Sequence, residues 1–268
     1  MNLDLIPSVY RILDEVKDST GKAVEFVEAD GLATYAKVKI AREHMPSHII
    51  FYSPKHDELI NHLIAHECGH ILRILKAPPE KRIVPMSDRD SMTKVIHDLA
   101  SDLSRLSSLM PSRDVLEMVN VWHQGIITQL TSYPSDIMIE RWIHASYKEL
   151  RPYQRKSIMN QHADAIQVLS PKIKEVAPIK IYESYIIMNI VFFSMIGSTL
   201  RINFLKPFRS LPVLKRGKEL STITEKNYID GYEGDTAMIN CWANFLGLKE
   251  WFKWTNFENM PDGYLESI

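Results

Sequence analysis

The side chains best suited to metal binding and catalysis lie in one short stretch, His66-Glu67-Cys68-Gly69-His70, which reads H-E-x-x-H. Residues 59–75 around it are mostly apolar, as is typical of a helix with a buried face. Residues four apart share one face of a helix, so both histidines can bind one metal ion. Glu67 is rotated by about 100° from His66. The pattern therefore predicts a metal-dependent hydrolase in which Glu67 is the general base, not a ligand.

The stretch Ile64-Ala65-His66-Glu67-Cys68-Gly69-His70 resembles the AHExGH helix of zincin metallopeptidases, and most nearly that of the ImmA/IrrE-like intracellular group and the wider gluzincins. The resemblance runs from the strand before the motif to Leu75. It implies Zn²⁺ as the cofactor, His66 and His70 as its ligands, and Glu67 as the residue that activates water. It also implies hydrolysis of a peptide bond in an intracellular regulatory protein.

A catalytic zinc site usually has three protein ligands and one open position. The best candidates for the third ligand are Asp136 and Glu140, which lie four apart on one face of a helix expected to begin near Pro134. Acids on an apolar helix face are costly unless they bind or pair. Gluzincin-like enzymes carry a Glu ligand and, four residues later, an Asp that orients the first His. This chain has the reverse order.

We therefore expect Glu140 to bind the metal and Asp136 to orient a ligand histidine, with the exchanged assignment left open. In the alternative without metal binding, Asp136 stabilises a helix N-terminus and Glu140 pairs on the surface with Arg141 or His144. Asp98 is a weaker candidate for the third ligand.

Other polar groups near these segments have less defined roles. His62 lies one turn before His66, and we expect it at the exposed mouth of the site, with a position facing the cleft as the alternative. Cys68 is expected to be a small core residue. Three further side chains are candidates to stabilise an oxyanion: Tyr133, His144 and Tyr147.

The elements that position these residues follow from hydrophobic periodicity. A helix is expected over residues 3–17, followed by strands at 24–27, 35–40 and 47–52 and then by the motif helix. We expect the sheet to be antiparallel, and the resemblance places the last strand beside the cleft, where it can pair with an extended substrate.

The remainder of the chain is expected to be helical, with helices at 88–109, 113–131, from Tyr133 onward, and 236–248. Residues 201–218 carry six basic residues and no acid, and we interpret them as a solvated loop instead of a nucleic-acid site. The expected fold is α+β, mainly α and zincin-like. Residues 1–76 would form the N-terminal half, and residues 77–268 a helical half that supplies the third ligand.

Composition narrows the class of protein. The chain has 268 residues, of which 45% are hydrophobic, and a net charge of −1, so no general attraction to nucleic acid or membrane is expected. Two cysteines and the lack of a signal-peptide pattern favour the cytoplasm. Residues 184–200 are uncharged but short for a bilayer span, which favours a core helix.

Two functions are compatible with these features. The first is a zinc metallopeptidase acting on a protein or peptide substrate. The alternative is a non-catalytic zincin-like module that binds a protein partner and whose metal is structural or absent.

Overall fold

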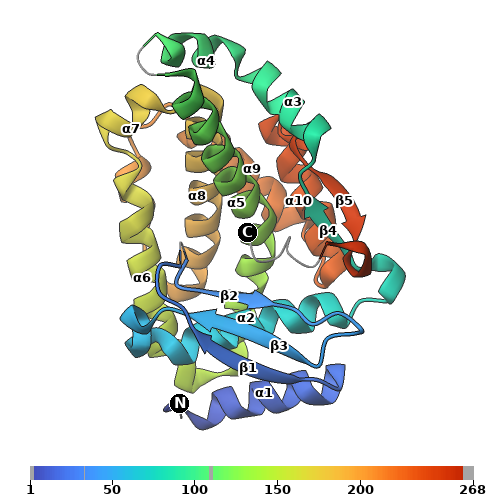
Figure 1. Cartoon of the computed structure of the whole chain (residues 1–268). Helices are drawn as coiled ribbons and strands as arrows, with labels where there is room; N and C mark the ends of the chain where they lie inside the picture. Colours follow the sequence, from blue (N-terminus) through green and yellow to red (C-terminus); the bar gives the residue numbers. More distant parts are fainter. Residues whose placement is uncertain (1–2, 33, 109–110, 262–268) are drawn as a thin grey trace.

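The computed structural model describes residues 3–32, 34–108 and 111–261. Helices make up 69% of the structure and the strands are short, which confirms the α+β, mainly α prediction. A small sheet with two helices lies at one end of a bundle of longer helices (Figure 1).

The N-terminal sheet has the strand order β1-β3-β2, with bounds Ala23–Glu28, Ser47–Tyr52 and Ala36–Lys39. β2 is antiparallel to β3, but β1 is parallel to it, so the prediction of an antiparallel sheet is wrong. Hydrophobic alternation identifies strands but not their partners. Because β3 is paired on both sides, the expectation that this last strand pairs with a substrate is also wrong.

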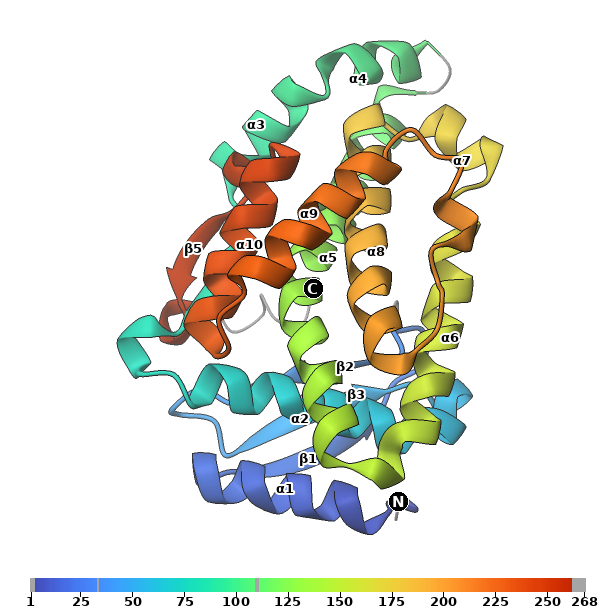
Figure 2. The ribbon, with the colours of Figure 1, turned by 180° about the vertical axis from the view of Figure 1, so that it is seen from behind.

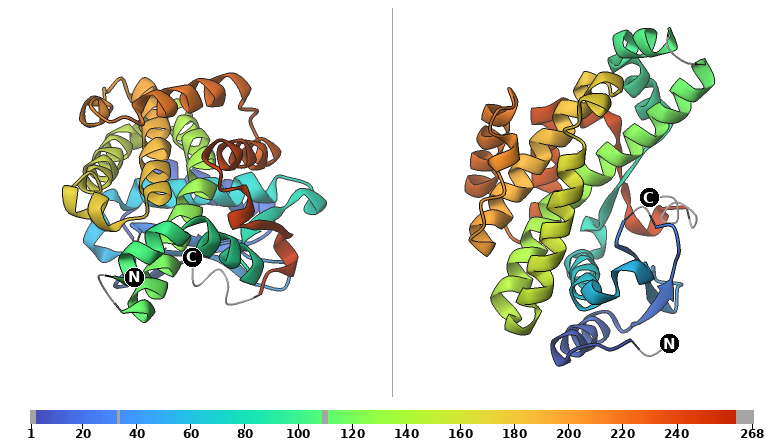
Figure 3. Two further views of the ribbon diagram at one scale, coloured as in Figure 1. Left: turned by 90° about the horizontal axis from the view of Figure 1, so that it is seen from above. Right: turned by 90° about the vertical axis from the view of Figure 1, so that its left-hand side faces the viewer.

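Two helices pack beside this sheet. α1 (Pro7–Thr20) starts later than expected, buries Val9, Ile12 and Val16, and ends at Gly21 in the left-handed conformation. α2 (Ile60–Leu75) carries the motif and follows the short helix η1 (Pro54–Leu59). In the side view, α2 lies between the sheet and the long helices α5 and α6 (Figure 3).

The helical part is built around α8, which packs against α5 and α9. Figure 2 shows α9 packed across α8 on the back of the molecule. The helices are α3 (Arg89–Asp98), α4 (Ala100–Ser107), α5 (Ser112–Ser146), α6 (Arg151–Gln167), α7 (Pro171–Val176), α8 (Ile179–Leu200), α9 (Leu214–Asn227) and α10 (Tyr232–Leu246).

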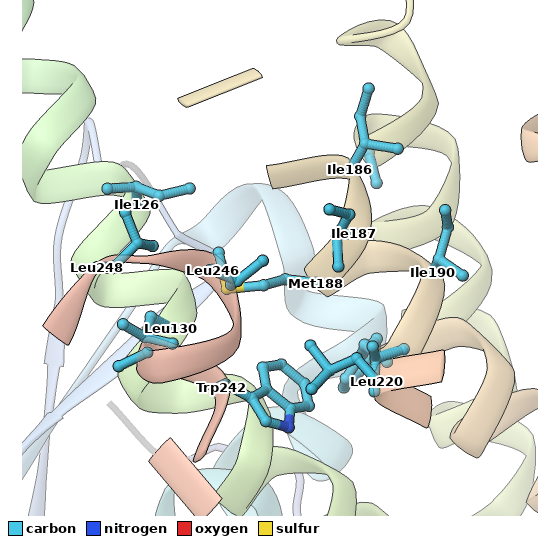
Figure 4. Close-up of a cluster of buried hydrophobic side chains, with 14 of the residues drawn as sticks. Ile126, Leu130, Ile186, Ile187, Met188, Ile190, Leu220, Trp242, Leu246 and Leu248 are labelled. Carbon is cyan, nitrogen blue, oxygen red and sulfur yellow. The ribbon is translucent and has the colours of Figure 1, made fainter. Parts of the chain in front are cut away.

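Two clusters of buried apolar side chains hold the molecule together. The larger one joins α5, α8, α9 and α10, and Figure 4 shows part of it around Trp242 and Leu220. The smaller one joins α1, the sheet and α2, but it also includes Ile139 and Ile143 from α5. The C-terminal end of α5 therefore packs with the N-terminal part and brings Asp136 and Glu140 toward the motif.

Several helix boundaries differ from those expected. The two helices expected at 113–131 and from Tyr133 are one, because α5 continues through Pro134. The helix expected at 88–109 is divided at Leu99 into α3 and α4, and its last residue lies outside the described residues. The basic loop expected at 201–218 contains a short helix, η4 (Lys206–Phe208), and the start of α9.

A second small sheet was not expected. β4 (Ile83–Met86) pairs antiparallel with β5 (Lys253–Asn256), close to the end of the described chain. This pairing ties the loop after the motif helix to the C-terminal part of the chain.

Among the described residues, α8 is the one helix long and apolar enough to cross a membrane. Of its most apolar 18-residue window, 72% is buried inside the protein. This burial agrees with the core helix predicted from the sequence.

Candidate metal centre

The centre forms where α2 crosses α5, and Gly69 makes this crossing possible. A Cβ atom on Gly69 would lie 2.6 Å from Cγ2 of Ile139, far closer than carbon atoms normally approach. The absence of a side chain at this position lets the two helices touch. Asp136 and Glu140 lie near Ile139 on α5, and both meet the histidines of α2.

Three side-chain atoms converge on one point. Nε2 of His66 lies 3.3 Å from Nε2 of His70, and Oδ1 of Asp136 lies 3.4 Å from the first nitrogen and 3.1 Å from the second. Ligands bound to zinc at 2.0–2.2 Å with tetrahedral angles are about 3.3 Å apart. These three residues have the spacing of a metal-ligand set.

Asp136 has a feature that would suit it to bind a cation. Its Oδ1 atom is buried and has no hydrogen-bond partner among the described residues. Burial by itself raises the pKa of this carboxyl, but its close approach to His66 and His70 outweighs that effect and lowers the pKa. Asp136 is thus held as an anion whose free lone pair faces two imidazole nitrogens.

Glu140 makes contacts of a different kind. Its Oε1 atom lies 2.8 Å from Nδ1 of His66, and both carboxylate oxygens lie 3.0 Å from Nε2 of His62. Gln154 donates to Oε2 of Glu140 at 2.7 Å. These are hydrogen-bond lengths. Burial raises the pKa of Glu140, but attraction to His62 and hydrogen bonds with His62 and His66 lower it overall.

The hydrogen bond from His66 to Glu140 sets the chemistry of that ring. If Nδ1 carries the proton that Glu140 accepts, Nε2 keeps its lone pair and faces His70 and Asp136. A carboxylate on the far side of a ligand histidine is the usual way to fix its tautomer.

Glu67 follows His66 on α2, and neither group of converging donors includes it. Its side chain is nearly buried, and this burial raises the pKa of its carboxyl despite the attraction of His70 and His66. Glu67 therefore has the position expected of a base that acts beside a metal without binding it.

The remaining candidate residues have other roles. His62 is fully buried, so the expectation of an exposed position is wrong; α5 covers it through Glu140. Asp98 accepts hydrogen bonds from Lys180 and from Trp251, which is part of the larger core. Cys68 is fully buried, as predicted, and burial raises the pKa of its thiol.

The candidates for oxyanion stabilisation are already engaged. Tyr133 donates to Oδ1 of Asn189 at 3.1 Å, His144 contacts Gln154 at 3.0 Å, and Tyr147 packs on Trp142. Glu140 is fully buried, so the alternative in which it pairs on the surface with Arg141 or His144 is wrong; Arg141 pairs instead with Glu225 at 2.8 Å.

Comparison with family models found no match, and neither the curated proteins nor the solved structures gave a significant match.

Proposed function

We propose that the chain is a zinc-dependent metallopeptidase of the zincin type. The observation that carries this proposal is the spacing of 3.1–3.4 Å among three atoms: Nε2 of His66, Nε2 of His70 and the buried Oδ1 of Asp136. A set of two imidazoles and one carboxylate suits zinc.

In this proposal Asp136 is the third ligand and Glu140 the partner of His66, which exchanges the roles expected from the sequence. The short contacts of Glu140 to His66, His62 and Gln154 are hydrogen bonds that already occupy both of its oxygens. The oxygen of Asp136 has no such partner.

Partial solvent access favours a catalytic site over a closed structural one. The side chains of His70 and His66 are 24% and 15% exposed, whereas Glu140 is fully buried. A structural zinc is usually enclosed by four protein ligands, while a catalytic zinc leaves one position open. When bound, zinc lowers the pKa of water to about 7 and polarises a carbonyl oxygen.

Glu67 is the residue that moves the proton. Its buried carboxylate has a raised pKa, which makes it a better base than an exposed glutamate. It would take a proton from the attacking water and return it to the leaving amine of the peptide. Glu140 would hold His66 in the required tautomer during this exchange.

The substrate we propose is a protein or peptide, and the resemblance of the motif helix favours a regulatory protein in the cytoplasm. The alternative, a module that binds a partner through a structural metal, predicts zinc binding without hydrolysis.

The test compares Glu67→Gln, Asp136→Ala and the wild type for zinc content and for cleavage of a peptide library. We expect Glu67→Gln to keep zinc and lose cleavage, and Asp136→Ala to lose both. Glu225→Gln, which changes an exposed carboxylate on α9, is the control and should leave both unchanged. Zinc binding by a wild type that cleaves nothing would favour the module instead.

A further inference from the structure

Three histidines one helical turn apart line the face of α2 that meets α5: His62, His66 and His70. Only the last two belong to the motif. His62 is fully buried, and its Nε2 atom lies 3.0 Å from both oxygens of Glu140. Nothing about the proposed reaction requires a third histidine here, so its burial calls for a physical explanation.

The contacts of His62 argue against a second metal ion among His62, His66 and Glu140. A tetrahedral ion would hold its ligand atoms about 3.3 Å apart. Nδ1 of His66 and Nε2 of His62 lie closer than this to the Glu140 carboxylate, at 2.8 and 3.0 Å. In addition, Gln154 directs an N–H at Oε2 of Glu140, where it would face the cation. The group is therefore a hydrogen-bond network around one carboxylate.

This network decides where the Glu140 carboxylate points. His66 and Gln154 donate to opposite oxygens, and His62 donates between them. A buried carboxylate with three N–H donors is well satisfied. Without His62, Glu140 would lack a donor and would be free to turn toward a metal bound at Asp136, which lies one turn earlier on the same face of α5.

Resting on the metal site proposed above, we propose that His62 is a positioning residue that holds Glu140 on Nδ1 of His66 and away from the metal. His62 acts through Glu140 and has no contact with the reacting atoms. This role assigns the proton of His62 to Nε2. It leaves Nδ1 as an unprotonated nitrogen, which agrees with the finding that Nδ1 is buried without a hydrogen-bond partner in the described part of the chain.

The experiment measures zinc affinity by competition with a chelator, together with unfolding of the metal-free protein. His62→Leu removes the donor at similar size, and we expect about a 10–100-fold loss of zinc affinity, as for other partners of ligand histidines. His62→Gln places an amide N–H near the position of Nε2, and we expect it to restore most of this loss.

His123→Leu is the matched control. His123 is also a buried histidine, and its Nε2 lies 2.8 Å from the carbonyl oxygen of Trp251 in the larger core. We expect it to weaken folding without changing zinc affinity. A His62→Leu variant that binds zinc as the wild type does would overturn the inference, and so would a His62→Gln variant that binds as poorly as His62→Leu.

Two further measurements separate the possible failures. Nitrogen-15 NMR of the metal-free wild type should show His62 protonated at Nε2, and protonation at Nδ1 would overturn the inference even if His62→Leu did not fold. Asp136→Ala tests the underlying site, because unchanged zinc affinity in that variant would refute the proposed metal centre. If Asp136→Ala loses zinc affinity but His62→Leu binds zinc as the wild type does, only the role of His62 is refuted.

Discussion

Substitution of Gly69 by alanine should weaken the proposed metal centre, although Gly69 is not one of its proposed ligands. The added Cβ would lie 2.6, 3.0 and 3.3 Å from Cγ2, Cγ1 and Cδ1 of Ile139. Carbon atoms in normal contact are about 3.5–4.0 Å apart, so the two helices must separate by about 1 Å or Ile139 must change rotamer. Ile139 is almost fully buried, which leaves little room for a rotamer change.

The effect on stability is a balance of two terms. Overpacking a core typically costs about 1–3 kcal/mol. Alanine is favoured over glycine within a helix by about 1 kcal/mol. We therefore expect Gly69→Ala to destabilise the metal-free protein by about 0–2 kcal/mol, which a urea titration can measure.

The effect on metal binding should be larger, because Asp136 moves with α5. A shift of about 1 Å would stretch its 3.1 and 3.4 Å distances to the histidines beyond the spacing of tetrahedral ligands. We expect a loss of zinc affinity of at least tenfold in a chelator competition. The double variant Gly69→Ala with Ile139→Ala removes the clashing atoms and should recover affinity, although Ile139→Ala costs about 2–5 kcal/mol of stability.

Two results would refute this reasoning. Wild-type zinc affinity in Gly69→Ala would mean that the crossing of α2 and α5 does not control the position of Asp136. Failure of the double variant to recover affinity would mean that the alanine acts through something other than Ile139.

Two other predictions follow from the same structure. Asp136→Ala should remove most zinc affinity, whereas Glu140→Ala should reduce it by about 10–100-fold; the opposite ranking in a chelator competition would restore Glu140 as the ligand. Burial, with a smaller effect of Lys22, lowers the pKa of His48 to about 4, and its ring accepts from the N–H of Ala41 at 2.9 Å. In the unfolded chain this histidine takes up a proton near pH 6.5, whereas in the folded protein it does so only near pH 4. The free energy of unfolding should therefore fall as the pH drops from 6.5 toward 4, by at most about 1.4 kcal/mol per pH unit. His48→Asn should flatten this slope in urea titrations of the metal-free protein, and equal slopes would contradict the assignment.

The local sequence pattern was enough to predict those features of the protein that depend only on residues close together in the sequence. The four-residue spacing places His66 and His70 on one helical face whatever surrounds them. The same periodicity predicted the last strand at 47–52 and the buried run within α8. The fold class followed from counting such segments.

The tertiary structure decided what depends on contacts between distant segments. Asp136 and Glu140 share one face of α5 in any helical arrangement, so the sequence left open which of them meets Nε2 of His66 and which meets Nδ1. The crossing at Gly69 determines which carboxylate meets which nitrogen, because the contact of Gly69 with Ile139 fixes the part of α5 that lies against the histidines of α2. The burial of His62 has the same origin, since a carboxylate 78 residues away covers it. Strand partners, likewise, depend on the path of the chain and not on local alternation, which is why the parallel pairing of β1 with β3 could not be foreseen.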